Sequence, residues 1–469
     1  MRSVLTIISL LVSLLYMNCS GDRSGSPIQV LKNATIFDGN GNSFVGFVII
    51  EGGLISEIGE DIEIPSHAEV IDLRGKYITP GLVDAHVHYF QTGFYDSRPD
   101  ALDIRDSLPY PEVMAYQKAN PQRYHEAYLR SGITAVYDVG GFPWSINLQK
   151  SAENDLNAPH VAASGPLITP APASMINTFN TESDTVMYHL GSEELGRRIV
   201  RQNTSWGSTG IKLWALAPVD LQDMSRLNAL ADEINKSGNQ LIVHATNLEG
   251  ARAAINLGAK VLVHSVNEDP IDDNFIQLMI ENKVIMTPTL VVSLGYLKTT
   301  KAVLGEPFDY WDKNAVVDEK TRSLLKNASH FARFANTRTL RLRVTWSEKF
   351  IAREDSFMLD NLRRLYDAGA LLAVGTDAGN PGTLHGPSIY DEMEAMQAAG
   401  IAPLDLIVMA TRNGAMAMRR LSDLGTLEKG KQADLIVLEE DPSQDIANMR
   451  SITHVMRGGL MRPVNEKFY

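Results

Sequence analysis

The sequence predicts an α/β protein made of a (β/α)8 TIM barrel and a small β-sandwich domain built from both chain ends. Two observations lead to this prediction. Between residues 80 and 420, apolar segments with strand character alternate with helix-competent stretches, which is typical of a barrel of parallel strands. Residues 27–79 and 421–469 instead carry short β-rich segments separated by glycine-rich turns. A chain of 469 residues is long enough for one large domain and a second, smaller one.

The first residues have the pattern of an export signal. Arg2 supplies a short positive region, and the apolar run Val4–Met17 is too short to span a bilayer but typical of a signal peptide. We expect residues 1–18 to be removed and Cys19, the only cysteine, to be lipidated, which would anchor an exported lipoprotein in the cell envelope, facing the periplasm or in the outer membrane. The residues before Cys19 differ from the usual small-residue pattern, so a plain secretory signal with an incidental cysteine is the alternative.

The barrel domain, residues 80–420, is expected to contain eight strands, most of them followed by a helix. The strand candidates are Val83–His88, Thr134–Val139, Val161–Ser164, Gly210–Ala215, Leu241–Thr246, Val261–Val266, Val284–Leu290 and Leu371–Asp377. Residues 303–360 break this rhythm because they are long, mostly helical and mixed in charge. An insertion of this length favours a lid or a substrate wall, and an ordinary helical pair on the outside of the barrel is the alternative.

Histidines gather at the ends of the expected barrel strands. His86 and His88 lie two residues apart on one strand, so their side chains point the same way and can grip one metal ion. His244 and His264 end two further strands, and Asp377 ends the last one. His-x-His alone is weak evidence, but five ligand-type residues at the edge where such barrels carry their active sites predict a metal centre.

Lys212 lies in the fourth expected strand and needs a different explanation. A free ammonium has no lone pair for a metal ion and would be repelled by it. A buried lysine near metal ions loses its proton, and the neutral amine can react with CO2 to give an anionic carbamate that bridges two cations. The carbamate, Asp377 and a bridging hydroxide then offset most, but not all, of the charge of two divalent ions, which leaves positive charge for a developing oxyanion. The alternative is a barrel lysine paired with an acidic neighbour.

These residues resemble the amidohydrolase superfamily, and the resemblance covers nearly the whole chain after the signal segment. It rests on the Lys212 strand, the two single histidines and three stretches: Thr79–His88 (TPGLVDAHVH), Gly375–Gly379 (GTDAG) and Gly425–Leu435 (GTLEKGKQADL). Within the superfamily, the chain is similar to the imidazolonepropionase-like members that include Xaa-Pro and Xaa-Arg dipeptidases.

The resemblance implies a ligand set for two divalent ions, which we expect to be zinc. His86, His88 and Asp377 would hold one ion, and His244 and His264 the other, with carboxylated Lys212 as the bridge. Asp377 would take a proton from the attacking hydroxide and pass it to the departing amine, as a general base and then a general acid.

One position separates this chain from the deaminases of the superfamily. Those deaminases use a single metal ion and place a glutamate three residues after the histidine of the fifth strand, where this chain has Asn247. Imidazolonepropionase itself does not use a bridging lysine, so Lys212 argues against that activity. The sequence therefore predicts hydrolysis of a C–N bond in an amide or peptide-like small molecule, a dipeptide being one such substrate.

Substrate and partners are less directly marked in the sequence. His385, Tyr296 and Arg98 lie on loops after the eighth, seventh and first expected strands and are candidates for binding the substrate; His385 has the alternative of a loop histidine without a role. A net charge of −13 and the lack of a Lys/Arg run argue against nucleic acid and anionic lipid as partners, which leaves the membrane only through the lipid anchor. The same centre could serve a lactonase or phosphotriesterase. A non-catalytic binding protein in the envelope is the other alternative, which loss of a metal ligand would support.

Overall fold

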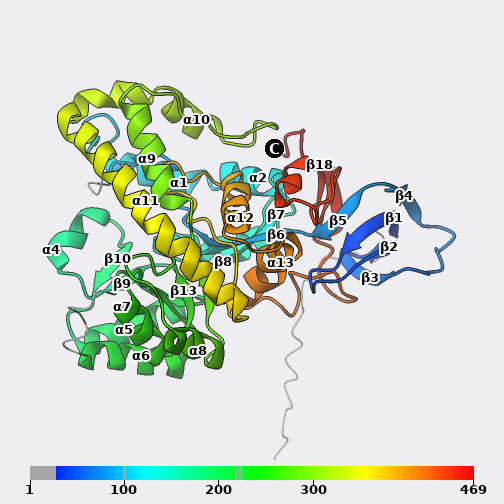
Figure 1. Ribbon diagram of the computed structural model, residues 1–469, viewed down its shortest axis with the longest axis horizontal. Helices are drawn as coiled ribbons and strands as arrows, with labels where there is room; N and C mark the ends of the chain where they lie inside the picture. The colour runs from blue at the N-terminus through cyan, green and yellow to red at the C-terminus, as the bar shows by residue number, and fades with distance from the viewer. Residues whose placement is uncertain (1–27, 99–101, 217–219, 221–223) are drawn as a thin grey trace, which may run out of the picture.

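The computed structural model of the protein describes residues 28–98, 102–216, 220 and 224–469 (Figure 1). The expected signal peptide and Cys19 lie outside the described residues. Within the described part of the chain, the helices are too short or too polar to cross a bilayer.

Parallel strands form the centre of the large domain, in two sheets. One sheet contains β6 (Leu82–Val87), β7 (Ile133–Asp138) and β8 (His160–Ala163). The other has the order β10-β9-β11-β12-β13-β14-β15. Its strands are β9 (Leu167–Thr169), β10 (Met187–His189), β11 (Ile211–Leu213), β12 (Leu241–His244), β13 (Ala259–Val263), β14 (Ile285–Thr287) and β15 (Leu371–Leu372). Each of the eight expected barrel strands overlaps one of these strands. Every residue of β6 and β7 is buried, as in parallel sheets covered on both faces.

The prediction of one closed eight-stranded sheet is not met, because the parallel strands fall into two sheets. Backbone hydrogen bonds still join the edges of the two sheets. On one side the Thr209 N–H donates to Ala163 O at 3.0 Å. On the other side the N–H groups of Ala85, Asp377 and His88 donate to Val374 O, His86 O and Ala378 O at 3.0, 2.7 and 2.9 Å. Two short strands that the sequence did not predict, β9 and β10, account for the first break, since β9 pairs with the edge of β11. At the second break, β15 is only two residues long and the chain leaves the extended conformation soon after it.

Helices surround the parallel strands, and Figure 1 shows α5 to α8 gathered along one side of the seven-stranded sheet. The helices of the large domain are α1 (Tyr110–Ala119), α2 (Gln122–Arg130), α3 (Pro143–Glu153), α4 (Ala173–Ile176), α5 (Glu193–Ser205), α6 (Ser225–Ser237), α7 (Leu248–Asn256), α8 (Asp273–Glu281), α9 (Val292–Val303), α10 (Glu319–Lys326), α11 (Thr337–Asp367), α12 (Ser388–Ala398), α13 (Pro403–Val408) and α14 (Gly414–Ala417). Side chains cap several of them: Ser192 accepts a hydrogen bond from the Leu195 N–H at the start of α5, and Asp272 does the same for α8.

The helical insertion expected at residues 303–360 corresponds to α10, a 3-10 segment at Ala328–Phe334 and most of α11. With 31 residues, α11 runs diagonally across the face of the molecule in Figure 1. Its Met358 reaches the cavity described below, so this part of the insertion forms a wall of the cavity.

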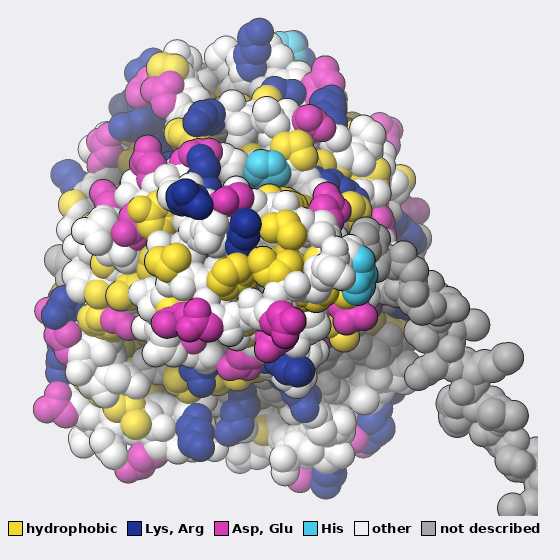
Figure 2. Space-filling view, turned by 90° about the vertical axis from the view of Figure 1, so that its right-hand side faces the viewer, with side chains coloured by type: hydrophobic (Ala, Val, Ile, Leu, Met, Phe, Trp, Pro, Cys, Tyr) yellow, Lys and Arg dark blue, Asp and Glu magenta, His cyan; other side chains and the backbone are white. Residues whose placement is uncertain are grey.

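The small domain is one eight-stranded sheet rather than two stacked sheets. Its strands are β1 (Gln29–Phe37), β2 (Ser43–Glu51), β3 (Leu54–Gly59), β4 (Glu69–Asp72), β5 (Tyr77–Pro80), β16 (Leu435–Leu438), β17 (Ile452–Arg457) and β18 (Leu460–Pro463). The order is β18-β17-β16-β5-β1-β2-β3, with β4 beside the first half of β1. The two chain ends meet where β5 pairs with β16, and apolar residues of both ends, such as Ile36 and Leu435, share one core. The face at this end of the molecule carries acidic and basic side chains side by side (Figure 2).

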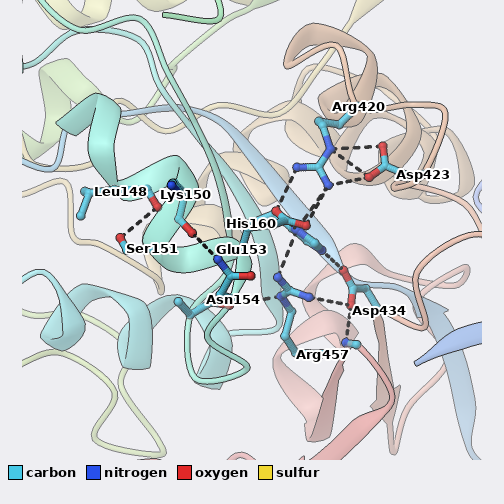
Figure 3. Close-up of polar contacts among 12 residues, drawn as sticks. Leu148, Lys150, Ser151, Glu153, Asn154, His160, Arg420, Asp423, Asp434 and Arg457 are labelled. Carbon is cyan, nitrogen blue, oxygen red and sulfur yellow. Dashed lines mark hydrogen bonds and ion pairs between the residues drawn. The ribbon is translucent and has the colours of Figure 1, made fainter. Parts of the chain in front are cut away.

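A cluster of charged side chains links the large domain to the small one (Figure 3). His160, in β8, is fully buried, and its Nε2 lies 2.8 Å from Asp434 Oδ2 at the start of β16. Its Nδ1 lies 2.7 Å from Glu153 Oε2 and 3.1 Å from Arg457 Nη2. Arg420 contacts the outer side of the cluster through Glu153. Because these residues come from both domains, the cluster fixes the small sheet against the strands of the large domain.

Candidate metal centre

One cavity of about 350 Å³ collects the predicted metal ligands, most of them at the carboxyl ends of the parallel strands. His86 lies near the end of β6 and His88 directly after it, while His244 ends β12. The remaining three are His264, which follows β13, Lys212 in the middle of β11, and Asp377, in the loop that follows β15. All six line the cavity, so the structure brings the whole predicted set together.

Asp377 is the meeting point of the histidines. Its Oδ1 lies 3.2 Å from His86 Nε2 and 3.0 Å from His88 Nε2, and its Oδ2 lies 3.9 Å from His264 Nε2. The rings of His244 and His264 are 4.3 Å apart between centroids. Ligand atoms of His86, His264 and Asp377 all lie within 4.8 Å of one another, a spacing that one metal ion can span.

Several buried polar atoms in this group have no hydrogen-bond partner. Both ring nitrogens of His86 and Oδ1 of Asp377 are fully enclosed and unpaired by hydrogen-bond geometry. A buried polar atom without a partner is costly unless something else satisfies it. Imidazole nitrogens and carboxylate oxygens that converge in this way fit a divalent metal ion.

The backbone is unusual at two of the ligands. His264 and Asp377 have φ values of 73° and 58°, in the left-handed region that residues other than glycine rarely adopt. The Asp377 N–H donates to His86 O at 2.7 Å, which holds this turn against β6. Such local strain persists only where the surrounding structure enforces it, and it concentrates at functional sites.

Hydrogen bonds on the outer sides of the rings orient two of the histidines. His88 Nδ1 lies 2.6 Å from Gly140 O, and His264 Nδ1 lies 2.6 Å from Thr289 Oγ1. Because Nδ1 of His88 must be the protonated nitrogen to donate to a carbonyl, its Nε2 lone pair is left facing Asp377 and the cavity. Gly140 and Thr289 were not expected from the sequence, since nothing local marks a backbone carbonyl or a loop threonine as a partner of a distant histidine.

Asp84 is a further residue that the sequence reasoning missed. It is buried in β6, and its carboxylate accepts hydrogen bonds from the Thr376 hydroxyl at 2.6 Å and the Thr376 N–H at 3.0 Å. It thereby fixes the residue next to Asp377. Burial raises the pKa of Asp84 to about 7. The available signal was its position two residues before His86, on the same face of the strand.

Burial sets the protonation of the candidate ligands. It lowers the pKa of His86 to about 4 and that of His244 to about 3, so both rings are neutral at pH 7 and can act as ligands. Burial alone would raise the pKa of Asp377, but His86 and His88 outweigh it and hold the pKa well below its ordinary value. Burial also lowers the pKa of Lys212 to about 7, so a large fraction of its side chain is a neutral amine at neutral pH.

Two of the three expected substrate residues reach the cavity. Tyr296 and Arg98 both line it; the Tyr296 hydroxyl donates to Asn380 Oδ1 at 3.0 Å. His385 does not, which corrects the interpretation of this residue as a substrate ligand. Its Nδ1 lies 2.6 Å from the Tyr128 hydroxyl and its Nε2 3.1 Å from Gln91 O, so both nitrogens bond to the protein behind the cavity.

The position that holds a glutamate in the related deaminases has a structural role here. Asn247 is the N-cap of α7, and its Oδ1 accepts a hydrogen bond from the Gly250 N–H at 2.7 Å. Its amide group also donates to Leu216 O at 3.3 Å. The Asn247 side chain is therefore occupied by the protein backbone and offers no acid to a substrate.

Comparison with known proteins gives relatives that match over most of the chain. It is 24% identical to ochratoxinase of Aspergillus niger over 449 residues, which cover 88% of this chain and 82% of that enzyme. It is 23% identical to imidazolonepropionase of Geobacillus sp. (strain WCH70) over 439 residues, 84% of each chain. A solved Xaa-Pro dipeptidase with methionine bound in its active site has the same fold, with a TM-score of 0.69 and 23% identity over 93% of this chain and 100% of that one. The amidohydrolase family model matches residues 77–461, which include all six cavity residues of the predicted centre. The protein therefore belongs to the amidohydrolase family of hydrolases.

Proposed function

We propose that this protein hydrolyses a C–N bond of an amide or peptide-like small molecule, with water activated at a two-metal centre. The observation that carries the proposal is the convergence of six side chains on one cavity. They are His86, His88, Lys212, His244, His264 and Asp377. Both ring nitrogens of His86 and Oδ1 of Asp377 are buried without a hydrogen-bond partner, which supports metal binding in particular.

Two divalent ions, zinc in our proposal, suit this donor set. His86, His88 and Asp377 would hold one ion, and His244 and His264 the other. The bound ions would supply Lewis acidity and lower the pKa of water toward neutrality. Three or four ligands suffice for one tetrahedral zinc ion, so six cavity residues point to more than one.

Lys212 completes the set only in a modified form. Its neutral amine would react with CO2 to form a carbamate, releasing one proton and leaving a carboxylate-like anion between the two ligand groups. The lowered pKa of Lys212 and its complete burial support this reaction, because an ammonium buried beside two cations would be strongly disfavoured.

Asp377 is the proposed proton carrier. Its carboxylate takes the proton of the attacking water and returns it to the amine as the C–N bond breaks, so one residue serves both steps. Ring deamination would need a second acid, and Asn247 cannot supply a proton at neutral pH. The relative whose name identifies a dipeptidase also favours cleavage of an amide-type bond over ring deamination.

Metal content and a substrate panel test the proposal together. Elemental analysis should find about two ions per chain in the unmodified protein and fewer in Lys212→Ala. Lys260→Ala, which removes an exposed lysine from β13, is the matched control and should keep both ions. A panel of dipeptides, N-acyl amides and lactones then identifies the bond. One ion per chain in the unmodified protein contradicts the two-metal centre, and release of ammonia from purines or pyrimidines without cleavage of any amide contradicts the reaction type.

We also propose that the protein is exported and held in the cell envelope by lipid on Cys19. The apolar run Val4–Met17 and the position of the only cysteine at its end support this. Cys19→Ala should move the protein from the membrane fraction to the soluble fraction. An unchanged fractionation, with a mature protein that begins at another residue, contradicts lipidation.

A further inference from the structure

The wall of the candidate active-site cavity is predominantly apolar. Nine apolar side chains contribute to it, three of them large aromatic rings. They are Phe90, Leu167, Phe179, Val186, Met187, Trp214, Pro288, Val292 and Met358. They come from the loop after β6, the β9–β11 region, the loop after β14 and helices α9 and α11, so several separate elements contribute to the apolar surface.

Charge is scarce on this wall. Outside the six residues of the candidate metal centre, Arg98 is the one Lys, Arg, Asp or Glu side chain among the described lining residues. Its Nε donates to Asp96 Oδ1 at 2.7 Å, and both side chains are buried. Its guanidinium also lies 5.7 Å from the ring centre of Phe90. The charge of Arg98 is thus already matched by the protein.

The remaining lining groups are neutral hydrogen-bonding side chains. Asn267 is one of them, and its Oδ1 is buried without a hydrogen-bond partner. This amide oxygen can accept a hydrogen bond from an uncharged substrate that carries an N–H or O–H group. Among the described lining residues outside the metal centre, Arg98 is the one cation that could face a substrate carboxylate, and Asp96 already pairs with it. These residues include no Asp or Glu that could pair with a substrate ammonium, and burying an unpaired charge is strongly unfavourable.

We propose that the substrate is uncharged and apolar on both sides of the scissile bond, such as an aryl or branched alkyl amide, rather than a dipeptide with free termini. This rests on the amide hydrolysis proposed above. Trp214 is the specificity-determining residue we assign: it follows β11 directly, and its ring centroid lies 6.0 Å from that of His244. Its indole therefore contacts the substrate group beside the reacting carbonyl.

A pair of substrates with and without the two charged groups tests the proposal. Phenylalanyl-proline and 3-phenylpropanoyl-pyrrolidine share the phenylpropanoyl part, the pyrrolidine ring and the tertiary amide, but the second lacks both the ammonium and the carboxylate. We expect kcat/KM to be at least about tenfold higher for the uncharged compound. Equal or faster cleavage of the dipeptide overturns the inference and leaves the proposed amide hydrolysis intact. If neither compound is cleaved but another amide of the panel is, the charged and uncharged forms of that amide decide the ranking. Failure to cleave any amide contradicts the proposed function itself.

Two substitutions test the role of the wall. Trp214→Ala should raise KM for the uncharged substrate by about tenfold or more with a smaller change in kcat, whereas Trp206→Ala, at an exposed tryptophan after α5, should change neither. Met358→Lys places a cation on the wall and should shift the preference toward the carboxylate-bearing dipeptide. Met175→Lys, at a methionine of α4 that is 64% exposed, is its matched control. An unchanged preference in Met358→Lys, with the variant folded and active, contradicts selection by charge.

Discussion

Replacement of Asp434 by Asn should weaken the connection between the two domains. The carboxylate is 6% exposed, accepts from the Gly458 N–H at 2.7 Å and lies 2.8 Å from His160 Nε2, with Arg457 Nη1 at 3.8 Å. An asparagine side chain has the same size as aspartate and keeps one acceptor oxygen, but it carries no charge. The group that faces His160 is then either an amide nitrogen or an uncharged, weaker acceptor. Breaking a buried pair by removing one partner costs about 3–5 kcal/mol. Because the Gly458 bond survives, we expect about 3 kcal/mol.

Asp423→Asn is the matched control. Asp423 pairs with Arg420 at the outer side of the same cluster, and its side chain is 32% exposed, so solvent screens the pair. Exposed pairs contribute about 0–1 kcal/mol. Urea unfolding followed by tryptophan fluorescence at pH 7 measures both variants, with equal m-values as the check that the transitions are comparable. Losses that agree within about 0.5 kcal/mol between the two variants would refute the reasoning, since burial would then make no difference.

The pH dependence of the same variant is a second readout. Burial alone would raise the pKa of Asp434, but His160 and Arg457 outweigh it and hold the pKa below its ordinary value. A carboxyl group with a lowered folded-state pKa contributes stability that is fully present above its unfolded pKa, about 3.9. That contribution is lost as the pH falls through the lower folded value. The stability difference between the unmodified protein and Asp434→Asn should therefore persist at pH 7 and shrink below about pH 4.

Three further substitutions address the site. Asp377→Asn should keep much of the bound metal, measured by elemental analysis, yet lower turnover on a cleaved amide by several orders of magnitude, because it removes the proposed proton carrier. Thr289→Val removes the hydroxyl 2.6 Å from His264 Nδ1 and should weaken metal affinity about 10–100-fold in a chelator competition. Thr345→Val, at an exposed position of α11, should not change the metal affinity. His385→Phe loses two buried hydrogen bonds and should cost about 1–3 kcal/mol in urea unfolding without raising KM. A raised KM at full stability would restore a substrate role for His385.

The local pattern of the sequence was enough to locate strands and candidate ligands. An apolar strand that ends in histidine can be recognised from consecutive residues, as in Leu241–His244. The alternation of strand and helix predicts parallel strands, whose carboxyl ends all lie at the same end of the barrel. The expected strands overlap β6, β7, β8 and β11 to β15 for this reason. The three-residue strands β9 and β10 were missed because segments so short carry no periodicity of their own.

Local patterns in the sequence were therefore enough to predict an α/β protein with parallel strands, the family resemblance and the six residues that line one cavity. The groups that surround those six residues became known only from the folded structure. Asp84, Thr289 and the Gly140 carbonyl are far in sequence from the site residues, or neighbours of them, to which they hydrogen-bond. His385 lies on an equally suitable loop, but its ring nitrogens bond to the Tyr128 hydroxyl and the Gln91 carbonyl instead of facing the cavity. Strand and turn preferences act between neighbouring residues, whereas the direction of a buried polar side chain depends on which distant donor or acceptor satisfies it. The division of the parallel strands into two sheets could not be predicted either, because hydrogen bonding between strand edges depends on segments that are far apart in the chain.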